Sequence, residues 1–217
     1  PLPSPAPWPE GKRRLITVGR LGKEKSFDVV LKAVAELARE EDVFLVHIGE
    51  GPELPHLKAL AKELGVADRV LFLGPVPYRR IGGYYRLAAL FLFASETETQ
   101  GLVIWEAQAM GVPVVAVGAE GVLEGVEDGK TGFLVPPGDF RALAEKALEL
   151  LKDEERRRRF SLQARAFALK RSAETIAEQI VAVYDEASEI LRVEPRRLIF
   201  PFPRLPRSSL EDRPGGF

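Results

Sequence analysis

Short apolar runs alternate with longer amphipathic segments along most of this chain, and that alternation limits the fold more than any other feature of the sequence. The apolar runs are almost unbroken, whereas the segments between them repeat apolar residues with helical spacing. Unbroken apolar runs are typical of strands buried on both faces, and the amphipathic segments are typical of covering helices. We expect strands at residues 14–18, 43–48, 70–74, 87–94, 112–117 and 133–135. The sequence therefore predicts an α/β fold with a doubly wound, Rossmann-like parallel sheet.

The expected helices and the flanking segments divide the chain into three parts. Residues 1–13 form a Pro-rich extended segment, residues 14–192 form one α/β domain, and residues 193–217 form a Pro- and Arg-rich tail. The tail is expected to lack regular structure unless it packs on a partner. Within the domain, Asp139 is expected to cap the helix that follows it. The glycine-rich stretch 119–132 reads as a surface loop. Helices are expected at residues 27–40, 53–65, 78–88, from 101 onward, 140–153, 154–169 and 173–191.

Composition and charge exclude several classes of function. A formal net charge of −1 and a pI near 6.3 disfavour nucleic-acid binding, which a strongly basic domain would indicate. No apolar run is long enough to span a bilayer and the start does not resemble a signal peptide, so a soluble, cytoplasmic protein is expected. With no Cys and only two His, no intrinsic metal site is expected. Abundant Arg and Pro without Cys would suit a thermophile.

Charged residues follow the first expected strand, at the edge where ligands bind in sheets of this kind. Arg20 lies in the loop and Lys25 at the opening of the next helix. An Arg fork and a mobile Lys charge together suit a diphosphate. Lys23 competes with Lys25 for this role, and a solvated charged loop explains the same residues.

The next two expected strands end in glycines, and each glycine has a ligand-binding and a purely structural interpretation. Gly49 permits close backbone approach after the second strand, or simply forms the turn into the next helix with Glu53. Gly74 and Val76 follow the third strand and could border a slot for a flat base, although the same run reads well as core.

A pair of glutamates flanks the helix that begins at Gly101. Glu98 falls in the loop after the strand at 87–94, and Glu106 falls about a turn and a half into the helix. The free amides of Gly101, Leu102 and Val103 would point toward a bound anion. Carboxylates do not bind phosphate, so hydroxyl groups are the expected partners of the two glutamates, and the segment suggests a site for a phosphorylated sugar donor.

Several other residues are assigned ordinary packing or solvation roles. A buried histidine within a strand is more often a core residue than a catalyst, and the same applies to large apolar residues on a helix. Two adjacent tyrosines could stack on a ligand or pack on the sheet. A solvated helix face is preferred over a membrane patch for the arginine run. These residues are His47, Trp105 and Met110, Tyr84 and Tyr85, and residues 156–159.

Several of these motifs occur in a fixed order, and together they resemble the C-terminal half of family-4 glycosyltransferases of the GT-B fold. They are Gly19-Arg20 with Lys25, GEGPE, VLFLGPV, the segment with Glu98 and Glu106, and VEDGKTGFLVPPGD. The resemblance covers residues 14–191, and agreement among several spaced motifs makes it specific. It implies a domain that binds a nucleotide sugar in an enzyme that retains the anomeric configuration.

By position, the resemblance implies a role for each candidate residue. Arg20 and Lys25 would hold the diphosphate, Glu98 would approach the donor sugar, and Glu106 would bond the ribose hydroxyls. The amides of residues 101–103 would meet the diphosphate and the sugar. Charge stabilisation of the departing diphosphate would then need no metal or other cofactor.

Two departures from the family pattern refine the expectation. Glu98-Thr99-Gln100-Gly101 stands where Glu-Gly-Phe-Gly is common, and it looks like the variant in glycosyltransferases that use UDP-glucose and diacylglycerol-type lipid acceptors. The chain also shows no counterpart of the N-terminal acceptor-binding domain. We therefore expect either a fragment of a longer enzyme, inactive alone and in possible peripheral contact with a membrane, or a free-standing donor-binding module.

Alternatives remain at the level of mechanism and class. Retention could follow a front-face route or a double displacement, for which Glu98 is the candidate nucleophile. A non-catalytic nucleotide-sugar-binding module and a GT-B sugar-nucleotide epimerase are the other functions considered. Phe200, Phe202 and Leu205 suggest that the tail docks on the missing domain or on a neighbouring chain.

Overall fold

The computed structural model describes residues 8–171 and residue 181. The expected helix at 173–191, apart from residue 181, the whole tail at 193–217 and the first seven residues lie outside the described residues.

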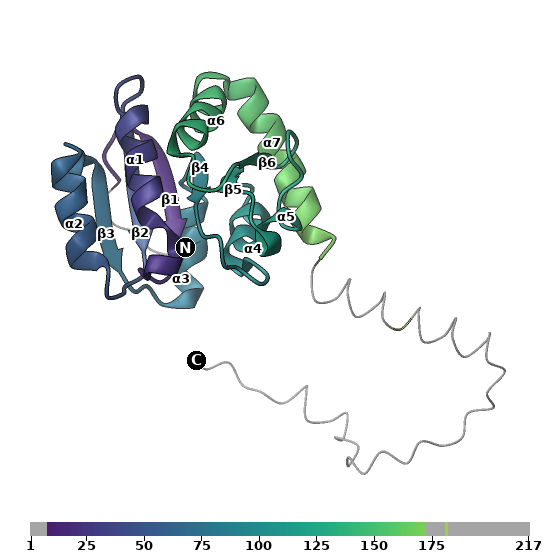
Figure 1. Ribbon diagram of the computed structural model, residues 1–217. Coiled ribbons are helices and arrows are strands. Elements are labelled where there is room, and N and C mark those ends of the chain that lie inside the picture. The colour runs from purple at the N-terminus through teal and green to yellow at the C-terminus, as the bar shows by residue number, and fades with distance from the viewer. Residues whose placement is uncertain (1–7, 172–180, 182–217) are drawn as a thin grey trace, which may run out of the picture. The chain divides into compact units, whose positions relative to one another are not determined.

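Residues 8–171 build one parallel sheet with helices on both faces (Figure 1). The six strands run in the order β3-β2-β1-β4-β5-β6, and every neighbouring pair is parallel. This arrangement confirms the predicted doubly wound α/β fold. The strands are β1 (Arg13–Val18), β2 (Val43–Ile48), β3 (Val70–Gly74), β4 (Leu90–Phe93), β5 (Val114–Val117) and β6 (Gly132–Val135).

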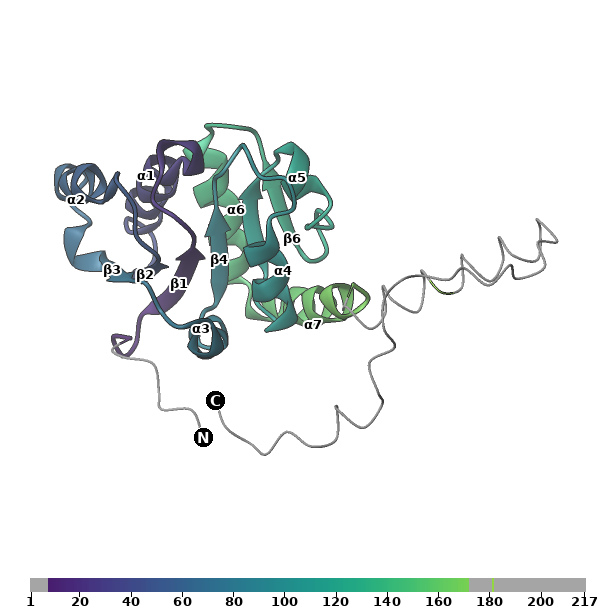
Figure 2. The ribbon, with the colours of Figure 1, turned by 90° about the horizontal axis from the view of Figure 1, so that it is seen from below.

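Helices connect the strands and divide between the two faces. Figure 2 shows α1, α2 and α6 on one side of the sheet and α3 and α4 on the other. The helices are α1 (Phe27–Leu37), α2 (Leu54–Glu63), α3 (Tyr78–Tyr85), α4 (Leu102–Ala109), α5 (Glu120–Leu123), α6 (Phe140–Lys152) and α7 (Glu154–Leu169), with short 3-10 helices η1 (Lys23–Lys25) and η2 (Ala67–Arg69). No helix in the described part of the chain is long and apolar enough to cross a membrane.

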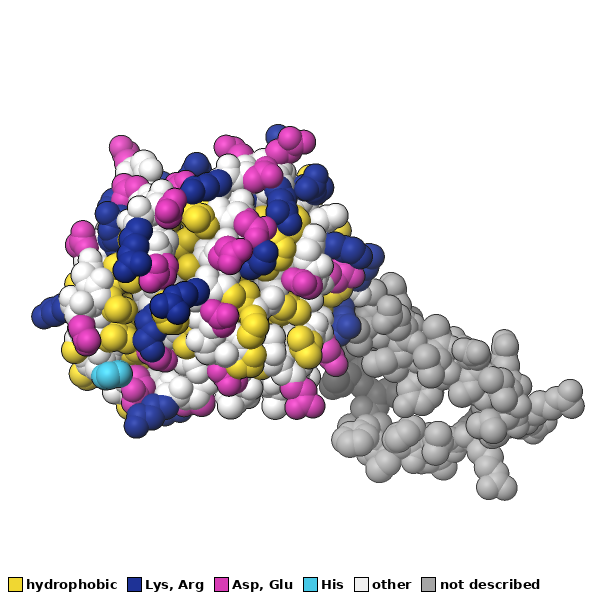
Figure 3. All heavy atoms as spheres, turned by 45° about the horizontal axis from the view of Figure 1, so that its top comes forward, with side chains coloured by type: hydrophobic (Ala, Val, Ile, Leu, Met, Phe, Trp, Pro, Cys, Tyr) yellow, Lys and Arg dark blue, Asp and Glu magenta, His cyan; other side chains and the backbone are white. Residues whose placement is uncertain are grey.

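Two hydrophobic layers sandwich the sheet because successive strand residues point to opposite faces. In β1, Leu15 faces the layer under α1 and α6, whereas Ile16 faces the layer under α3 and α4. β4 alternates in the same way, with Leu90 and Leu92 on one side and Phe91 and Phe93 on the other. This two-sided burial explains the unbroken apolar runs in the sequence. On the outside, Figure 3 shows Lys and Arg side chains interspersed with Asp and Glu.

Local contacts explain where the observed bounds differ from the expected ones. The strand expected at 87–94 begins only at Leu90, because Leu87 and Ala88 donate backbone hydrogen bonds to Tyr84 and Tyr85 and so complete the turn after α3. The glycine-rich stretch contains the short helix α5, which the glycines obscured in the sequence.

Other side chains confirm or correct the residue-level expectations. The carboxylate of Asp139 accepts a 2.9 Å hydrogen bond from the amide of Ala142, so the predicted cap is confirmed. Trp8, from the Pro-rich start, is buried in the layer under α3 and α4. Met110 is 42% exposed rather than a core residue, because it ends α4 at the surface.

Candidate functional site

A cavity of about 530 Å³ opens at the carboxyl edge of the sheet, between the loops that follow β1 and β4. The chain leaves β1 toward β2 on one side and leaves β4 toward β5 on the other, so the sheet order reverses here. Loops that diverge in this way leave a crevice, which is the usual ligand site of doubly wound sheets. The cavity therefore lies where the fold itself predicts binding.

One wall of this cavity is cationic. Arg20 and Lys25 both line it, whereas Lys23 lines a separate depression beside α2. The difference arises because η1 turns the chain after Arg20, and Ser26, with φ 46°, turns it again into α1. Of the two lysines left open by the sequence, the structure places Lys25 in the cavity.

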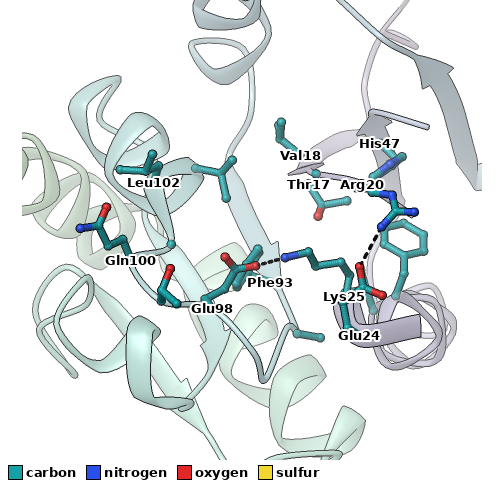
Figure 4. A pocket seen from close by; sticks show the side chains of 17 residues that line it. Thr17, Val18, Arg20, Glu24, Lys25, His47, Phe93, Glu98, Gln100 and Leu102 are labelled. Atoms are coloured by element: carbon teal, nitrogen blue, oxygen red, sulfur yellow. Dashed lines mark hydrogen bonds and ion pairs between the residues drawn. The ribbon is translucent and has the colours of Figure 1, made fainter. Parts of the chain in front are cut away.

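The opposite wall is formed by the loop that carries Glu98 and by the start of α4. Figure 4 shows Glu98 and Lys25 pointing toward each other across the cavity, and their Oε1 and Nζ atoms are 2.5 Å apart. Gly101, with φ 55°, turns the chain into α4, and no side chain caps this N-terminus. Gly101, Leu102 and Val103 line the cavity, so unsatisfied amides and the helix dipole favour an anion there.

Glu106 occupies a different environment from Glu98. It lies on the same face of α4 as Val103 but is not among the residues that line the cavity. Its carboxylate accepts a 3.2 Å hydrogen bond from the Tyr85 hydroxyl. Burial raises the pKa of Glu106, and the hydrogen bonds from Tyr85 and Tyr78 oppose that rise. The structure thus brings Glu98, but not Glu106, into the cavity with the cations.

A second cavity of about 790 Å³ adjoins the first along the ends of β2 and β3. The two share the backbone turn at Gly19 and the side chain of Arg20. Gly49 and Val76 line the second cavity, whereas Gly74 contributes a carbonyl that accepts the Gly49 amide at 2.9 Å. Val76 and Gly49, but not Gly74, therefore border a hollow next to the cationic loop.

Gly49 is also required for packing between two loops. Its φ is 137°, and a Cβ at this position would lie 2.0 Å from the carbonyl oxygen of Gly19. No side chain fits at that distance, so the loops after β1 and β2 meet only because residue 49 is glycine. This contact places Arg20 between the two cavities.

His47 lines the first cavity, although the sequence indicated only a core residue. Its side chain is 1% exposed, and it packs edge-on against Phe27 at a centroid distance of 4.7 Å. Burial lowers the pKa of His47 to about 4, while the nearby Gly19 carbonyl acts in the opposite direction. Neither ring nitrogen makes a hydrogen bond of ordinary geometry with the described residues. A polar residue inside an apolar strand was the only signal for it in the sequence.

The tyrosine pair and the aromatic residue of α4 have packing roles. Tyr84 and Tyr85 are both buried in the layer under α3 and α4, and Tyr85 packs against Phe91. Trp105 stacks on Phe167 of α7 at 5.2 Å. Neither tyrosine lines the two cavities, so stacking on a ligand in them is not their role.

The chemistry of this site is that of an anion-binding crevice. Two mobile cations and a helix N-terminus can hold phosphate groups, and the carboxylates of Glu24 and Glu98 in the same cavity can accept hydrogen bonds from hydroxyl groups. Within residues 8–171 no group of three or more His, Asp or Glu side chains is placed to hold a metal ion.

The fold and the site together define a doubly wound α/β protein with a cation-lined cavity at the reversal of strand order. Residues 3–167 match the sequence profile of the family described as "Glycosyl transferases group 1". The chain belongs to this family.

Individual relatives agree with this assignment. The chain is 35% identical over 176 residues to N-acetyl-alpha-D-glucosaminyl L-malate synthase of Bacillus anthracis, a match that covers 81% of this chain and 46% of the relative. The chain spans less than half the length of the curated relatives it matches.

Solved structures share the fold. Anabaena HepE, crystallised with UDP-glucose, superposes with a TM-score of 0.73 at 28% identity, over 81% of this chain and 49% of that one. The C-terminal domain of a group 1 glycosyl transferase, LpcC, from Francisella tularensis superposes with a TM-score of 0.67 at 25% identity, over 74% of this chain and 86% of that one. The sheet is thus the type found in one half of GT-B glycosyltransferases.

Proposed function

We propose that this chain is the donor-binding domain of a retaining, family-4 glycosyltransferase that transfers a sugar from a UDP-sugar. The observation that carries the proposal is the facing arrangement of Arg20 and Lys25 with the open N-terminus of α4 across one cavity. Such an arrangement suits two linked phosphates, since fixed amides and mobile cations approach from opposite sides. The UDP-glucose complex of a structural neighbour supports the choice of nucleotide.

Each part of a nucleotide sugar has a candidate location. Arg20 and Lys25 hold the diphosphate, and the amides of residues 101–103 meet it from the start of α4. Glu98 accepts hydrogen bonds from hydroxyl groups of the donor sugar, because it lies in the same cavity as the two cations. The base enters the adjoining hollow near Gly49 and Val76, close to Gly74. The resemblance alone makes Glu106 the candidate for the ribose hydroxyls, because its side chain lines neither cavity and bonds to Tyr85.

The proposed chemistry is electrostatic stabilisation of the leaving group. As the bond to the anomeric carbon breaks, negative charge gathers on the diphosphate, where Arg20, Lys25 and the dipole of α4 stabilise it. In a front-face reaction a donor phosphate oxygen accepts the acceptor's proton, so no protein nucleophile and no metal or other cofactor is required. Glu98 is the residue to test for a double displacement.

The acceptor side is proposed to lie outside this chain. The chain spans less than half the length of its curated relatives. We therefore infer that a further N-terminal domain binds the acceptor. The donor-binding domain should transfer little or no sugar when it is alone. The Thr99-Gln100 variant suggests a lipid acceptor and contact with a membrane surface from the cytoplasm, whereas the name of the Bacillus relative points to malate for that enzyme.

Calorimetry with UDP, ADP and GDP tests the donor site directly. We expect the 217-residue chain to bind UDP, and Arg20→Ala to weaken binding by about 1–3 kcal/mol, the range for a charged hydrogen bond. Arg158→Ala removes an exposed arginine of α7 and should leave binding unchanged. Failure of the unmodified chain to bind any of the three nucleotides would contradict the proposal.

A non-catalytic nucleotide-sugar-binding module is the alternative, because the residues that line both cavities are those proposed to bind the nucleotide sugar. It predicts binding without sugar transfer when the N-terminal half of a relative is fused to this chain, whereas the transferase predicts turnover. A sugar-nucleotide epimerase predicts conversion of UDP-glucose without an acceptor, which product analysis detects.

A further inference from the structure

Both cations of the cavity are paired with carboxylates of the same cavity. Lys25 Nζ lies 2.5 Å from Glu98 Oε1, and Arg20 Nη1 lies 3.6 Å from Glu24 Oε1. Figure 4 shows the Lys25–Glu98 pair reaching across the cavity and the Arg20–Glu24 pair along one side of it. Each cation that would bind an anion therefore has a carboxylate partner within the chain, close in the case of Lys25 and loose in the case of Arg20.

The two pairs differ in strength. The side chains of Lys25 and Glu98 are 27% and 18% exposed, whereas those of Arg20 and Glu24 are 67% and 42% exposed. Exposed pairs at such distances contribute little, because water screens them and both side chains lose freedom. A short, largely buried hydrogen bond between charged groups is considerably stronger. The Lys25–Glu98 pair therefore dominates.

The backbone holds the two partners within reach of each other. The Glu24 carbonyl in η1 accepts hydrogen bonds from the hydroxyls of Ser95 and Thr97 at 3.4 and 3.5 Å, which tie the lysine's turn to the loop of Glu98. The pair is thus set by the contact between two loops. An anion that engages Lys25 can displace the Glu98 side chain while this backbone contact persists.

The consequence differs for a nucleotide with and without its sugar. When a diphosphate takes Lys25, Glu98 loses its cation and comes to lie beside negative phosphate. Hydroxyl groups of an attached sugar can satisfy the freed carboxylate, whereas UDP alone leaves it without a partner next to like charge.

We propose that Glu98 is an internal counter-ion of the empty donor site, and that its return to Lys25 weakens the hold on UDP relative to UDP-sugar. This inference rests on the proposed function. It gives Glu98 a second role, that of favouring release of the spent nucleotide, and it gives Glu24 a weaker role of the same kind at Arg20.

Calorimetry of Glu98→Gln with UDP, UDP-glucose and UDP-N-acetylglucosamine tests the inference. The isosteric amide cannot pair strongly with Lys25, so we expect UDP to bind about fivefold more tightly than to the unmodified chain. The affinity for the two sugar nucleotides should rise less than the affinity for UDP, or should fall below that of the unmodified chain. The reason is that the amide also removes a hydrogen-bond acceptor for the sugar hydroxyls. Glu24→Gln should raise UDP affinity by less than about twofold.

Glu96→Gln is the matched control. It removes the same formal charge from the same loop, but Glu96 is exposed and lines neither cavity. Its UDP affinity should stay within about 1.5-fold of the unmodified chain, which separates loss of the pair from a general change of charge.

A second variant distinguishes the pair from simple repulsion. In a Lys25→Met background, Glu98→Gln should raise UDP affinity much less than it does with Lys25 present. Thermal unfolding without ligand confirms that each variant is folded before its binding is measured.

The outcomes separate the two proposals. If the unmodified chain binds UDP and folded Glu98→Gln binds it equally or more weakly, the counter-ion inference is wrong and the donor site stands. An equal gain for UDP and both sugar nucleotides would also overturn it. If no variant binds any nucleotide, the donor site itself is wrong and the inference falls with it.

Discussion

At the scale of single residues, His47 is the side chain whose environment departs most from what its type prefers. It lies in β2, is 1% exposed, packs against Phe27 and Phe72, and borders the first cavity. An imidazole in such surroundings is held neutral, because burial disfavours the charged form. Its burial therefore makes the stability of the fold depend on pH.

The sign of that dependence follows from linkage. Burial lowers the folded-state pKa of His47 to about 4 from an ordinary value of 6.5, so between these values only the unfolded chain binds the proton. Stability should fall as pH falls through this window. Between pH 7 and pH 4, the free energy of unfolding of the unmodified chain should fall by about 2–3 kcal/mol more than that of His47→Leu. Urea unfolding of both proteins at several pH values measures this difference, and parallel curves would contradict it.

At the scale of secondary-structure elements, α5 supports the loop that carries Glu98. Gly121 of α5 is buried, and a Cβ built there would lie 2.0 Å from the backbone oxygen of Glu98 and 2.6 Å from the carbonyl carbon of Thr99. Real Cβ atoms do not approach backbone so closely, so the helix and the loop can touch only through glycine. The position of one cavity wall thus depends on a helix that does not itself line the cavity.

Gly121→Ala should therefore affect both stability and the site. The added methyl must push the Glu98 loop away from α5, which we expect to lower the free energy of unfolding by about 1–3 kcal/mol. UDP-sugar affinity should fall in the same variant, because Glu98 and the start of α4 move together. Gly118→Ala is the control, since its Cβ would make only ordinary contacts, the nearest at 3.5 Å. Equal unfolding and binding curves for the two variants would refute the role of Gly121.

The joint between α6 and α7 illustrates what can be predicted at this scale. The carboxylate of Asp153 accepts a 2.8 Å hydrogen bond from the Arg156 amide and so caps α7, and Arg157 donates to the last carbonyls of α6 at Leu150 and Leu151. The sequence indicated both helices, because caps and helical spacing are local signals. Of the arginine face predicted to be solvated, Arg158 and Arg159 are exposed, whereas Arg156 and Arg157 are only half-exposed. It did not indicate that Arg157 closes the end of the preceding helix.

At the scale of the whole molecule, the pairing of β1 with β4 creates the site. The loops that hold Arg20 and Glu98 are far apart in the sequence, and they face each other only because Leu15 and Ile16 pair with Leu90 and Phe91. A ligand in the cavity contacts both halves of the sheet. Its binding energy therefore stabilises the fold across the β1–β4 boundary.

UDP should consequently raise the free energy of unfolding of the whole domain. A ligand that binds only the folded state at one hundred times its dissociation constant adds about 2.7 kcal/mol. Urea unfolding with and without UDP measures this increment, and Arg20→Ala should show a smaller one at the same UDP concentration. No increment at a concentration that saturates the chain in calorimetry would contradict a site that exists only in the folded domain.

Local sequence patterns were enough to predict the class of fold, the succession of strands and helices, and the edge of the sheet at which charged residues gather. These features follow from apolar periodicity, turn residues and parallel connection, which are properties of short segments. Tertiary structure alone decided that Lys25 rather than Lys23 enters the cavity, that Glu98 enters it while Glu106 bonds to Tyr85, and that Lys25 and Glu98 neutralise each other. Such choices depend on how loops distant in the chain meet, and no local pattern encodes the direction in which a side chain points once they do.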